Sequence, residues 1–571
     1  MRKRPLGVLP ILLFAVGCAG RPGQPGAGPI AGTAPTWPYF GKARVTEAPK
    51  AMVVSGSPIA SAVGRDILRR GGNAVDAAVA VGFALAVVHP EAGNIGGGGF
   101  MIIRPADGSV HALDYRETAP GRATRDLYLH AGPEASVTGH LSAGVPGAVA
   151  GLTEAHRKFG QLPFPVVIEP AIRLARDGFV VDEYRSLSIA DDTARLARFP
   201  ASRAAFLPGG RPPEPGTTLR QPDLWTTLEA IRDSGAAGFY RGRVADLIVA
   251  EMERGGGLIS REDLAAYRTI WREPVTIDYR GYTVYSMPPA SSGGVTMGQI
   301  LNIMEGFGQL PPFGSAALLH REAEAMRRAF TDRNKYLGDP AFVRNPMERL
   351  LSKAYAAELR REIGDQASIT PTVDSSERGA STTHYSVVDA EGNAVSCTTT
   401  LNNSYGSAVT VTGAGFLLND EMDDFATEPG RPNMYGLVQG EANAIAPGKR
   451  MLSAMTPSIV LDPAGQLYLV VGTPGGPKII TMVYHVISNV IDHRMKLADA
   501  VVAPRMHHQG LPDSLQVESD GFLPETLDSL RVRGHGVSLR GRWGDVEAII
   551  RTPRGWQGVS DPRLGGGGAG Y

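Results

Sequence analysis

The chain has 571 residues, of which 43% are hydrophobic and 20% charged, proportions typical of a globular protein. Its 57 basic residues balance its 57 acidic ones, so the formal net charge is zero. That balance, with no basic stripe along the chain, argues against a nucleic-acid-binding protein and leaves no long-range attraction to an acidic membrane.

The N-terminus has the composition of an export signal. A basic start, Arg2–Arg4, precedes an apolar run that is too short to span a membrane. The run ends in small residues before Cys18, which resembles a lipobox whose cysteine is lipidated, although Ala15 stands where leucine is usual. An ordinary cleaved signal is the alternative. The second of the two cysteines, Cys397, lies in an alternating apolar run and is expected to be a buried strand residue.

The first globular segment contains an apolar helix and a run of glycines. Asn73–Val88 is rich in Ala and Val, which predicts a helix buried on most sides. Four glycines follow at Gly96–Gly99, before a strand-like Phe100–Ile103. Their spacing fits neither a dinucleotide-binding turn nor a P-loop, so we expect close backbone packing rather than a phosphate site. Amphipathic helices are predicted further along at Leu224–Asp233, Val244–Arg254 and Leu319–Lys335.

A polar segment, Thr372–Ser381, has the composition of an exposed linker. Directly after it, Thr382–Val388 and Ala394–Leu401 have strand composition and are joined by a short turn, which predicts a hairpin. Symmetry about the turn places Thr382 directly opposite Thr400, with both side chains on one face. A register slip of one residue would break this pairing.

A threonine at the start of a core strand suits N-terminal nucleophile chemistry. Scission before Thr382 would give one residue both a hydroxyl nucleophile and an α-amine, whose pKa near 8 makes it a suitable base. The hydroxyl of Thr400 could hold the nucleophile's oxygen in place. Taken alone, Thr-Thr at a strand start is more often structural. The rest of the chain decides between the two interpretations.

Ordered blocks from about Val53 to Tyr571 resemble the γ-glutamyltransferase family. The junction Thr382–Asp389 is similar to that family's self-processing site. Further similar blocks are Gly72–Ala78, Gly96–Phe100, Asp114–Glu117, Pro289–Gly294, Met422–Phe425, Asn433–Val438, Pro474–Gly476 and Ala569–Tyr571. The resemblance implies the four-layer αββα sandwich of N-terminal nucleophile hydrolases. We expect neither cofactor nor metal, and the adjacent His507 and His508 lack the spacing of shared metal ligands.

The resemblance also implies autocatalytic cleavage between Ser381 and Thr382. After a signal over residues 1–18 and a tether over 19–40, the large subunit would be 41–381 and the small catalytic subunit 382–571. Both would form one αββα unit as a heterodimer. The reaction implied is cleavage of γ-glutamyl compounds, glutathione above all, with transfer to water, amino acids or dipeptides. We expect export to the periplasm or cell envelope, with lipid at Cys18 as the only membrane contact.

A substrate pocket follows from the same resemblance. Arg116 would bind the donor's α-carboxylate with its planar fork, whereas alone it would be taken for a solvated surface residue. Asp424, Glu421 and the Asn402 amide would face the α-ammonium. A calcium site is an alternative for the acidic cluster, but its spacing does not match the EF-hand loop.

The remaining pocket residues concern the reacting end and the lid. Backbone N–H groups of Gly475 and Gly476 would form an oxyanion hole, where each donor can contribute roughly 10²–10³ in rate. Ser453 matches the first of two pocket serines in the family, whereas Ala454 replaces the second. Tyr435 lies in a segment similar to the family's lid.

Two alternative functions are kept. A glutaryl-type acylase of the same fold, of the kind that cleaves cephalosporin side chains, would act on amides without an α-ammonium, which Asp424 and Glu421 disfavour. A non-catalytic binding lipoprotein could have kept the fold, but the intact Thr382, Thr400 and Gly475-Gly476 argue against it.

Overall fold

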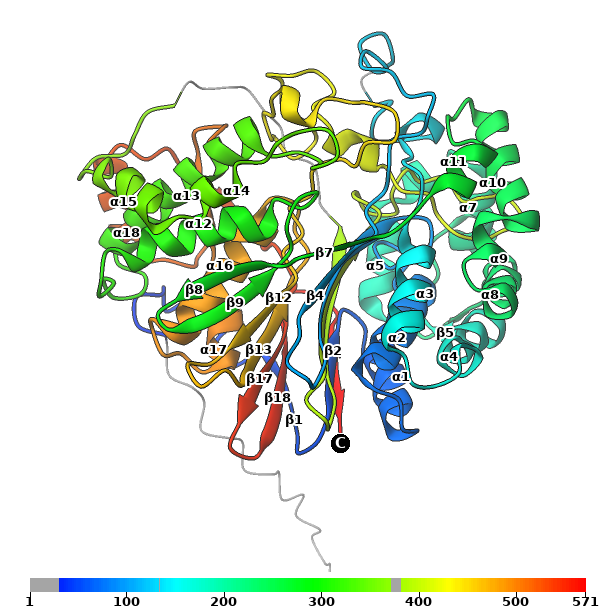
Figure 1. The fold of residues 1–571 in the computed structure, drawn as a ribbon, viewed down its shortest axis with the longest axis horizontal. Coiled ribbons are helices and arrows are strands. Elements are labelled where there is room, and N and C mark those ends of the chain that lie inside the picture. Colours follow the sequence, from blue (N-terminus) through cyan, green and yellow to red (C-terminus); the bar gives the residue numbers. More distant parts are fainter. Residues whose placement is uncertain (1–29, 133, 371–380) are drawn as a thin grey trace, which may run out of the picture.

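The computed structural model describes residues 30–132, 134–370 and 381–571. The predicted export signal, Cys18 and all but the last residue of the predicted linker lie outside these ranges. Two seven-stranded sheets pack face to face, and helices cover the outer face of each (Figure 1). The predicted four-layer αββα sandwich is confirmed. Within the described ranges, no helix combines the length and apolarity needed to cross a bilayer.

The first sheet contains the predicted hairpin at its centre, and every neighbouring pair is antiparallel. Its order is β19 (Gly567–Gly570), β2 (Met52–Ser55), β10 (Thr382–Val388), β11 (Ala394–Thr400), β3 (Gly98–Arg104), β4 (His111–Asp114) and β7 (Ile270–Arg272). The residues of β3 alternate between two cores: Phe100 and Ile102 face the second sheet, whereas Met101 and Ile103 face the helices. Because both faces are buried, the strand is a continuous apolar run.

The second sheet is also antiparallel throughout. Its order is β1 (Arg44–Ala48), β18 (Gly555–Ser560), β17 (Glu547–Thr552), β13 (Leu467–Gly472), β12 (Ser458–Leu461), β9 (Tyr282–Ser286) and β8 (Val275–Tyr279). Smaller sheets are formed by β14 (Met506–His507), β15 (Leu515–Glu518) and β16 (Val537–Arg540), and by β5 (Phe179–Val180) and β6 (Thr218–Leu219).

Helices form the two outer layers. Those packed on or beside the first sheet are α1 (Pro58–Arg69), α2 (Ala74–Val88), α3 (Ala148–Phe159), α4 (Phe164–Asp177), α8 (Pro222–Ser234), α9 (Ala237–Tyr240), α10 (Gly242–Gly255) and α11 (Arg261–Ala266). Those on the second sheet's side are α12 (Gly293–Glu305), α13 (Ala316–Tyr336), α14 (Met347–Leu350), α15 (Lys353–Arg361), α16 (Lys478–Ile491), α17 (Leu497–Val502) and α18 (Pro524–Val532). Short helices α5 (Glu183–Asp191), α6 (Thr193–Leu196) and α7 (Pro200–Phe206) lie between α4 and α8 in the chain.

The predicted helices correspond to α2, α8, α10 and α13, so these predictions are confirmed. All residues of α2 are buried, as its composition indicated, and Asn73 caps its N-terminus. The carboxylate of Asp389 accepts a hydrogen bond of 2.8 Å from the first backbone N–H of α2, on Ala74. This bond fixes the turn of the β10–β11 hairpin to the helix beneath it.

The glycine run packs against the end of this hairpin, as predicted. A Cβ on Gly97 would lie 2.1 Å from the carbonyl oxygen of Thr400, and one on Gly96 would lie 2.0 Å from that of Leu417. Glycine is therefore required for β3 to approach β11 where Thr400 ends it. Cys397 is buried within β11 with a free thiol, so that prediction is also confirmed.

Candidate active site

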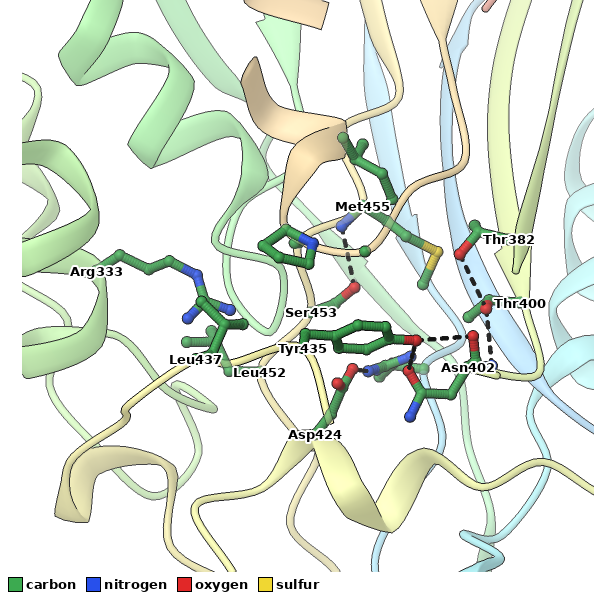
Figure 2. Close-up of a pocket in the computed structure, with 15 residues that line it drawn as sticks. Arg333, Thr382, Thr400, Asn402, Asp424, Tyr435, Leu437, Leu452, Ser453 and Met455 are labelled. Atoms are coloured by element: carbon green, nitrogen blue, oxygen red, sulfur yellow. Dashed lines mark hydrogen bonds and ion pairs between the residues drawn. The ribbon is translucent and has the colours of Figure 1, made fainter. Parts of the chain in front are cut away.

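The centre of the site is the start of the β10–β11 hairpin. Thr382 pairs with Thr400 across the two strands, in the register that the turn symmetry predicts. Their side-chain oxygens are 3.2 Å apart, and both residues are buried (Figure 2). The predicted pairing is confirmed.

A chain of hydrogen bonds runs from Thr382 to the peptide bond that precedes it. The Thr400 hydroxyl donates to the carbonyl oxygen of Ser381 at 3.1 Å and accepts from the backbone N–H of Asn402 at 2.8 Å. Because a hydroxyl has one proton to donate, Thr382 must be the donor in its own bond to Thr400. Thr400 thus polarises the carbonyl that Thr382 would attack and holds the attacking hydroxyl beside it.

Beside this hairpin lies a small pocket, here called the inner pocket, which Figure 2 shows with its lining residues. Of the predicted site residues, it is lined by Arg116, Thr382, Thr400, Asn402, Asp424, Tyr435, Ser453 and Gly476. Glu421 and Gly475 do not line it. Glu421 contacts the pocket through Arg116, and Gly475 faces a second cavity on the other side of Thr382.

Arg116 follows β4 and is fully buried, with three carboxylates around it. Its guanidinium pairs with Asp424, with Glu421 at 2.6 Å and with Glu117 at 3.4 Å. Burial by itself would lower the Arg116 pKa, but Glu421 and then Asp424 raise it above its usual value. Burial raises the pKa of both Glu421 and Asp424, and Arg116 counteracts that rise. The cluster therefore presents one firmly charged cation and carboxyls that retain protons above their ordinary range.

The two kinds of charge in this cluster are those that an α-amino-acid head would need. A substrate carboxylate can take the place of Asp424 on the Arg116 fork, while a substrate ammonium can take the place of Arg116 on Asp424. Glu421 and Asp424 are the first and last residues of a short 3₁₀ helix, Glu421–Asp424, which places both carboxyl groups next to Arg116.

Asn402 and Tyr435 close the inner pocket beside the hairpin. The Tyr435 hydroxyl donates to the side-chain oxygen of Asn402 at 2.7 Å and lies 2.8 Å from its carbonyl oxygen. Asn402 has a φ of 82°, a left-handed conformation that Asn tolerates better than most residues. Tyr435 is buried in the segment predicted to be a lid, and it lines both the inner pocket and the second cavity.

Two further features of the site are the serine that the resemblance assigned to the pocket and the glycine turn. Ser453 lies in the chain before β12, where its hydroxyl accepts from the Met455 backbone N–H at 3.1 Å. Ala454, beside it, also lines the pocket. Gly475 and Gly476 follow β13 with φ values of 139° and 55°, which only glycine adopts without strain at the first position.

One charged residue of the inner pocket was not predicted. Arg333 in α13 is 1% exposed and lines the inner pocket; it donates to Ser292 at 2.9 Å and to Gln439 at 3.3 Å. Burial lowers its pKa to about 10. The signal was present in the sequence, because Arg333 continues the buried spacing of Met326, Ala329 and Phe330 on an amphipathic helix.

The adjacent histidines His507 and His508 are both buried. His507 bonds Thr481 at 3.0 Å and Gln509 at 2.9 Å, which is the structural role expected for it. Across the described residues, no group of three or more His, Cys, Asp or Glu side chains has the arrangement of a metal site.

Known proteins resemble this chain over nearly its whole length. Residues 60–571 match the family model of gamma-glutamyltranspeptidase. The chain is 48% identical over 536 residues to a glutathione hydrolase proenzyme of Escherichia coli strain K12, covering 90% of this chain and 91% of that protein. It is 42% identical over 521 residues to the acylase ACY 1 proenzyme of Pseudomonas sp. strain V22, covering 89% and 90%. The crystal structure of cephalosporin acylase from Bacillus halodurans matches with a TM-score of 0.84 and 31% identity, covering 94% of this chain and 98% of that one.

Proposed function

This chain belongs to the gamma-glutamyltranspeptidase family, and on that basis we propose that it is a self-cleaving γ-glutamyltransferase and glutathione hydrolase. The observation that carries the proposal is the hydroxyl chain from Thr382 through Thr400 to the Ser381 carbonyl. It lies at the edge of a pocket whose charges suit an α-amino-acid head. The relatives named glutathione hydrolase support glutathione as the donor.

The first step matures the enzyme. The Thr382 oxygen attacks the Ser381 carbonyl carbon while the Thr400 hydroxyl stabilises the developing oxyanion. The peptide C–N bond breaks, the Thr382 nitrogen takes up the proton that the Thr382 hydroxyl has lost, and the acyl group moves to the Thr382 oxygen as an ester. Water then hydrolyses this ester, which leaves a large subunit, 41–381, and a small subunit, 382–571, that begins with a free α-amine.

The second step uses that amine. The Thr382 oxygen attacks the γ-amide of the donor, and its own α-amine takes the hydroxyl proton. Backbone N–H groups of Gly475 and Gly476 stabilise the oxyanion. The protonated amine then passes the proton to the departing nitrogen, and a γ-glutamyl ester of Thr382 remains. Water or an acceptor amine resolves this ester by the reverse proton transfers.

The donor's head group is recognised by charge. Arg116 and the Ser453 hydroxyl bind the α-carboxylate, whereas Asp424, Glu421 and the Asn402 amide bind the α-ammonium. Removing one partner from a charged hydrogen bond costs about 1.5–3 kcal/mol. Tyr435 covers the bound donor as part of the lid.

The acylase alternative is supported by two relatives, ACY 1 and the cephalosporin acylase. The acidic pair favours the γ-glutamyl donor, because a glutaryl group has no ammonium to compensate the carboxylates around Arg116. The two donors should be compared as p-nitroanilides on one protein preparation. A preference for the glutaryl compound would replace our assignment by the acylase.

Sequencing the N-terminus of the small subunit tests the maturation step. Any start other than Thr382 removes the nucleophile assignment. Thr382→Ala should give a single, unprocessed and inactive chain on a denaturing gel. A processed Thr382→Ala protein would indicate a contaminating protease instead of self-cleavage.

Export and lipidation are proposed from the first residues of the sequence. The basic start and the apolar run before Cys18 support export, and the small residues before Cys18 support a lipid anchor. Labelling with a fatty acid should mark the wild type but not Cys18→Ala. An unlabelled but exported wild type would indicate an ordinary cleaved signal.

A further inference from the structure

A second and larger cavity, here called the outer cavity, adjoins the inner pocket at Thr382. It has a volume of about 760 Å³, against about 20 Å³ for the inner pocket, and is lined on one side by Arg542, Trp543 and Asp545. Thr382 lines both spaces, so the reacting oxygen lies at their border. The side chains that line the outer cavity therefore affect which molecules can reach the Thr382 oxygen.

The glycine turn divides the two spaces. Gly476 lines the inner pocket, whereas Gly475 lines the outer cavity. A carbonyl bound by both backbone N–H groups has its carbon at the border, with its two substituents on opposite sides. If the acyl group occupies the inner pocket, the amine side of the scissile bond must extend into the outer cavity.

Buried polar groups without partners gather in the outer cavity. Among the described residues, no hydrogen-bond partner is present for Asp545 Oδ1, Trp543 Nε1, Glu91 Oε2 or His89 Nδ1, and all four side chains line this cavity. Asp545 is 2% exposed. Unpaired buried polar groups are uncommon in native proteins, and a cluster of them indicates a site made for a polar ligand.

The loop that contains Asp545 is fixed to the oxyanion turn. The backbone N–H of Asp545 donates to the Thr473 hydroxyl at 3.1 Å, and this hydroxyl donates to the carbonyl of Pro474 at 3.0 Å. Arg505 holds the carbonyl of Trp543 and also pairs with Asp561. Two hydrogen bonds thus connect Asp545 to the residue before Gly475, so its carboxyl has a defined position relative to the reacting carbonyl.

In the proposed transfer reaction, the outer cavity takes the leaving group and then the amino acid or dipeptide acceptor. We propose that Arg542, Trp543 and Asp545 determine which acceptors bind there, because they hold the two charged ends of the acceptor. This inference rests on the proposed function. The Asp545 carboxylate receives the acceptor's ammonium, and Trp543 Nε1–H with the Arg542 guanidinium receives its carboxylate. Arg542 is exposed at the rim and makes no ion pair with the residues that the structure describes.

The proton balance of transfer follows from this arrangement. The bound ammonium gives one proton to the Asp545 carboxylate and becomes a neutral amine, which forms the new C–N bond to the ester carbon. The Thr382 α-amine takes the amine's second proton and passes it to the Thr382 oxygen as the ester C–O bond breaks. Asp545 releases its proton to water through the open cavity.

The surroundings of Asp545 set the pH at which it can act. Burial, then Asp561, raises its pKa to about 7, while Arg44 and Arg505 lower it. Glu547 on β17 also faces it, with a pKa raised by burial and then by Asp545. Transfer relative to hydrolysis should therefore increase as the pH rises through about 7, because only the carboxylate form attracts an ammonium.

The experiment uses the processed enzyme with γ-glutamyl p-nitroanilide as donor. Glycylglycine and its C-terminal amide serve as acceptors that differ only in the carboxylate. Chromatography separates transfer product from free glutamate. We expect the acceptor KM to be at least tenfold lower for glycylglycine than for its amide, and Arg542→Gln to abolish this preference. Asp545→Asn should lower the ratio of transfer to hydrolysis at least tenfold with both acceptors and remove its pH dependence.

Asp528→Asn, an exposed carboxylate change on α18, is the matched control and should behave as the wild type. An unchanged ratio in Asp545→Asn, or equal KM values for both acceptors in the wild type, would overturn the inference. Because Arg542 is exposed, Arg542→Gln should fold normally. It therefore tests the inference even if Asp545→Asn does not fold. A wild type that fails to cleave the donor at all would instead contradict the proposed function.

Discussion

Replacing Thr400 by valine removes one hydroxyl while keeping the shape of the side chain. That hydroxyl donates to the Ser381 carbonyl at 3.1 Å and accepts from Thr382. Losing one oxyanion donor lowers a rate by roughly 10²–10³, which corresponds to roughly 3–4 kcal/mol in the barrier. We therefore expect Thr400→Val to slow cleavage at Ser381 by at least that factor.

The assay is the conversion of newly synthesised precursor into two bands, followed over time on a denaturing gel. Thr400→Ser retains the hydroxyl and should process within about tenfold of the wild type. The valine variant also leaves the backbone N–H of Asn402 without its acceptor, at a cost of about 1–3 kcal/mol in stability. Its unfolding midpoint should be measured to exclude misfolding. A folded Thr400→Val precursor that processes at the wild-type rate would refute the role of this hydroxyl.

Three further predictions concern the pocket and the core. Asp424→Asn should lower kcat/KM for γ-glutamyl p-nitroanilide about 10- to 100-fold by weakening the hold on the ammonium, with less effect on a glutaryl donor; equal losses on both donors would contradict the assignment. Ala454→Ser should lower the KM of the γ-glutamyl donor up to about tenfold, since it adds a hydroxyl beside Ser453; an unchanged KM means that this position does not face the carboxylate. Glu322, whose pKa burial raises to about 8, keeps a proton in the folded state that the unfolded state loses above about pH 4.5, so stability falls as pH rises between these values. Urea unfolding should find Glu322→Gln gaining up to about 5 kcal/mol on the wild type between pH 5 and pH 9; a difference that does not change with pH would show that Glu322 is ionised throughout.

Structural features that depend on residues close together in the chain were predictable from local sequence patterns. The β10–β11 register followed from the symmetry of the turn, and α2, α8, α10 and α13 followed from composition and periodicity. The helical periodicity also places Arg333 on the buried face of α13. The sequence analysis nevertheless did not separate Arg333 from the solvent-exposed charged residues of the same helix. Periodicity alone could have identified it.

Contacts between distant segments were not predictable from one sequence. Arg116 and Asp424 are 308 residues apart in the chain, and nothing local to either indicates that they form an ion pair. The resemblance assigned both to a substrate, but not to each other. The outer cavity is assembled from the ends of α2, α5, β13 and the segment before β17, so its chemistry appears only when the sheets are in place.

The position of Thr382 within the first sheet has a consequence for how the mature protein can be assembled. Both sheets contain strands from before and after the proposed cut, paired with one another. In the first sheet β2 lies between β19 and β10, and β3 pairs with β11; in the second, β1 pairs with β18 and β9 with β12. Scission before Thr382 would leave every one of these ladders intact but would divide the chain into two. Folding of the precursor is unimolecular, whereas refolding of the separated pieces would be bimolecular and would depend on their concentration. In the uncut chain, the covalent link keeps the two parts at a high effective concentration while they fold. The mature enzyme has lost this link and does not regain it after it unfolds.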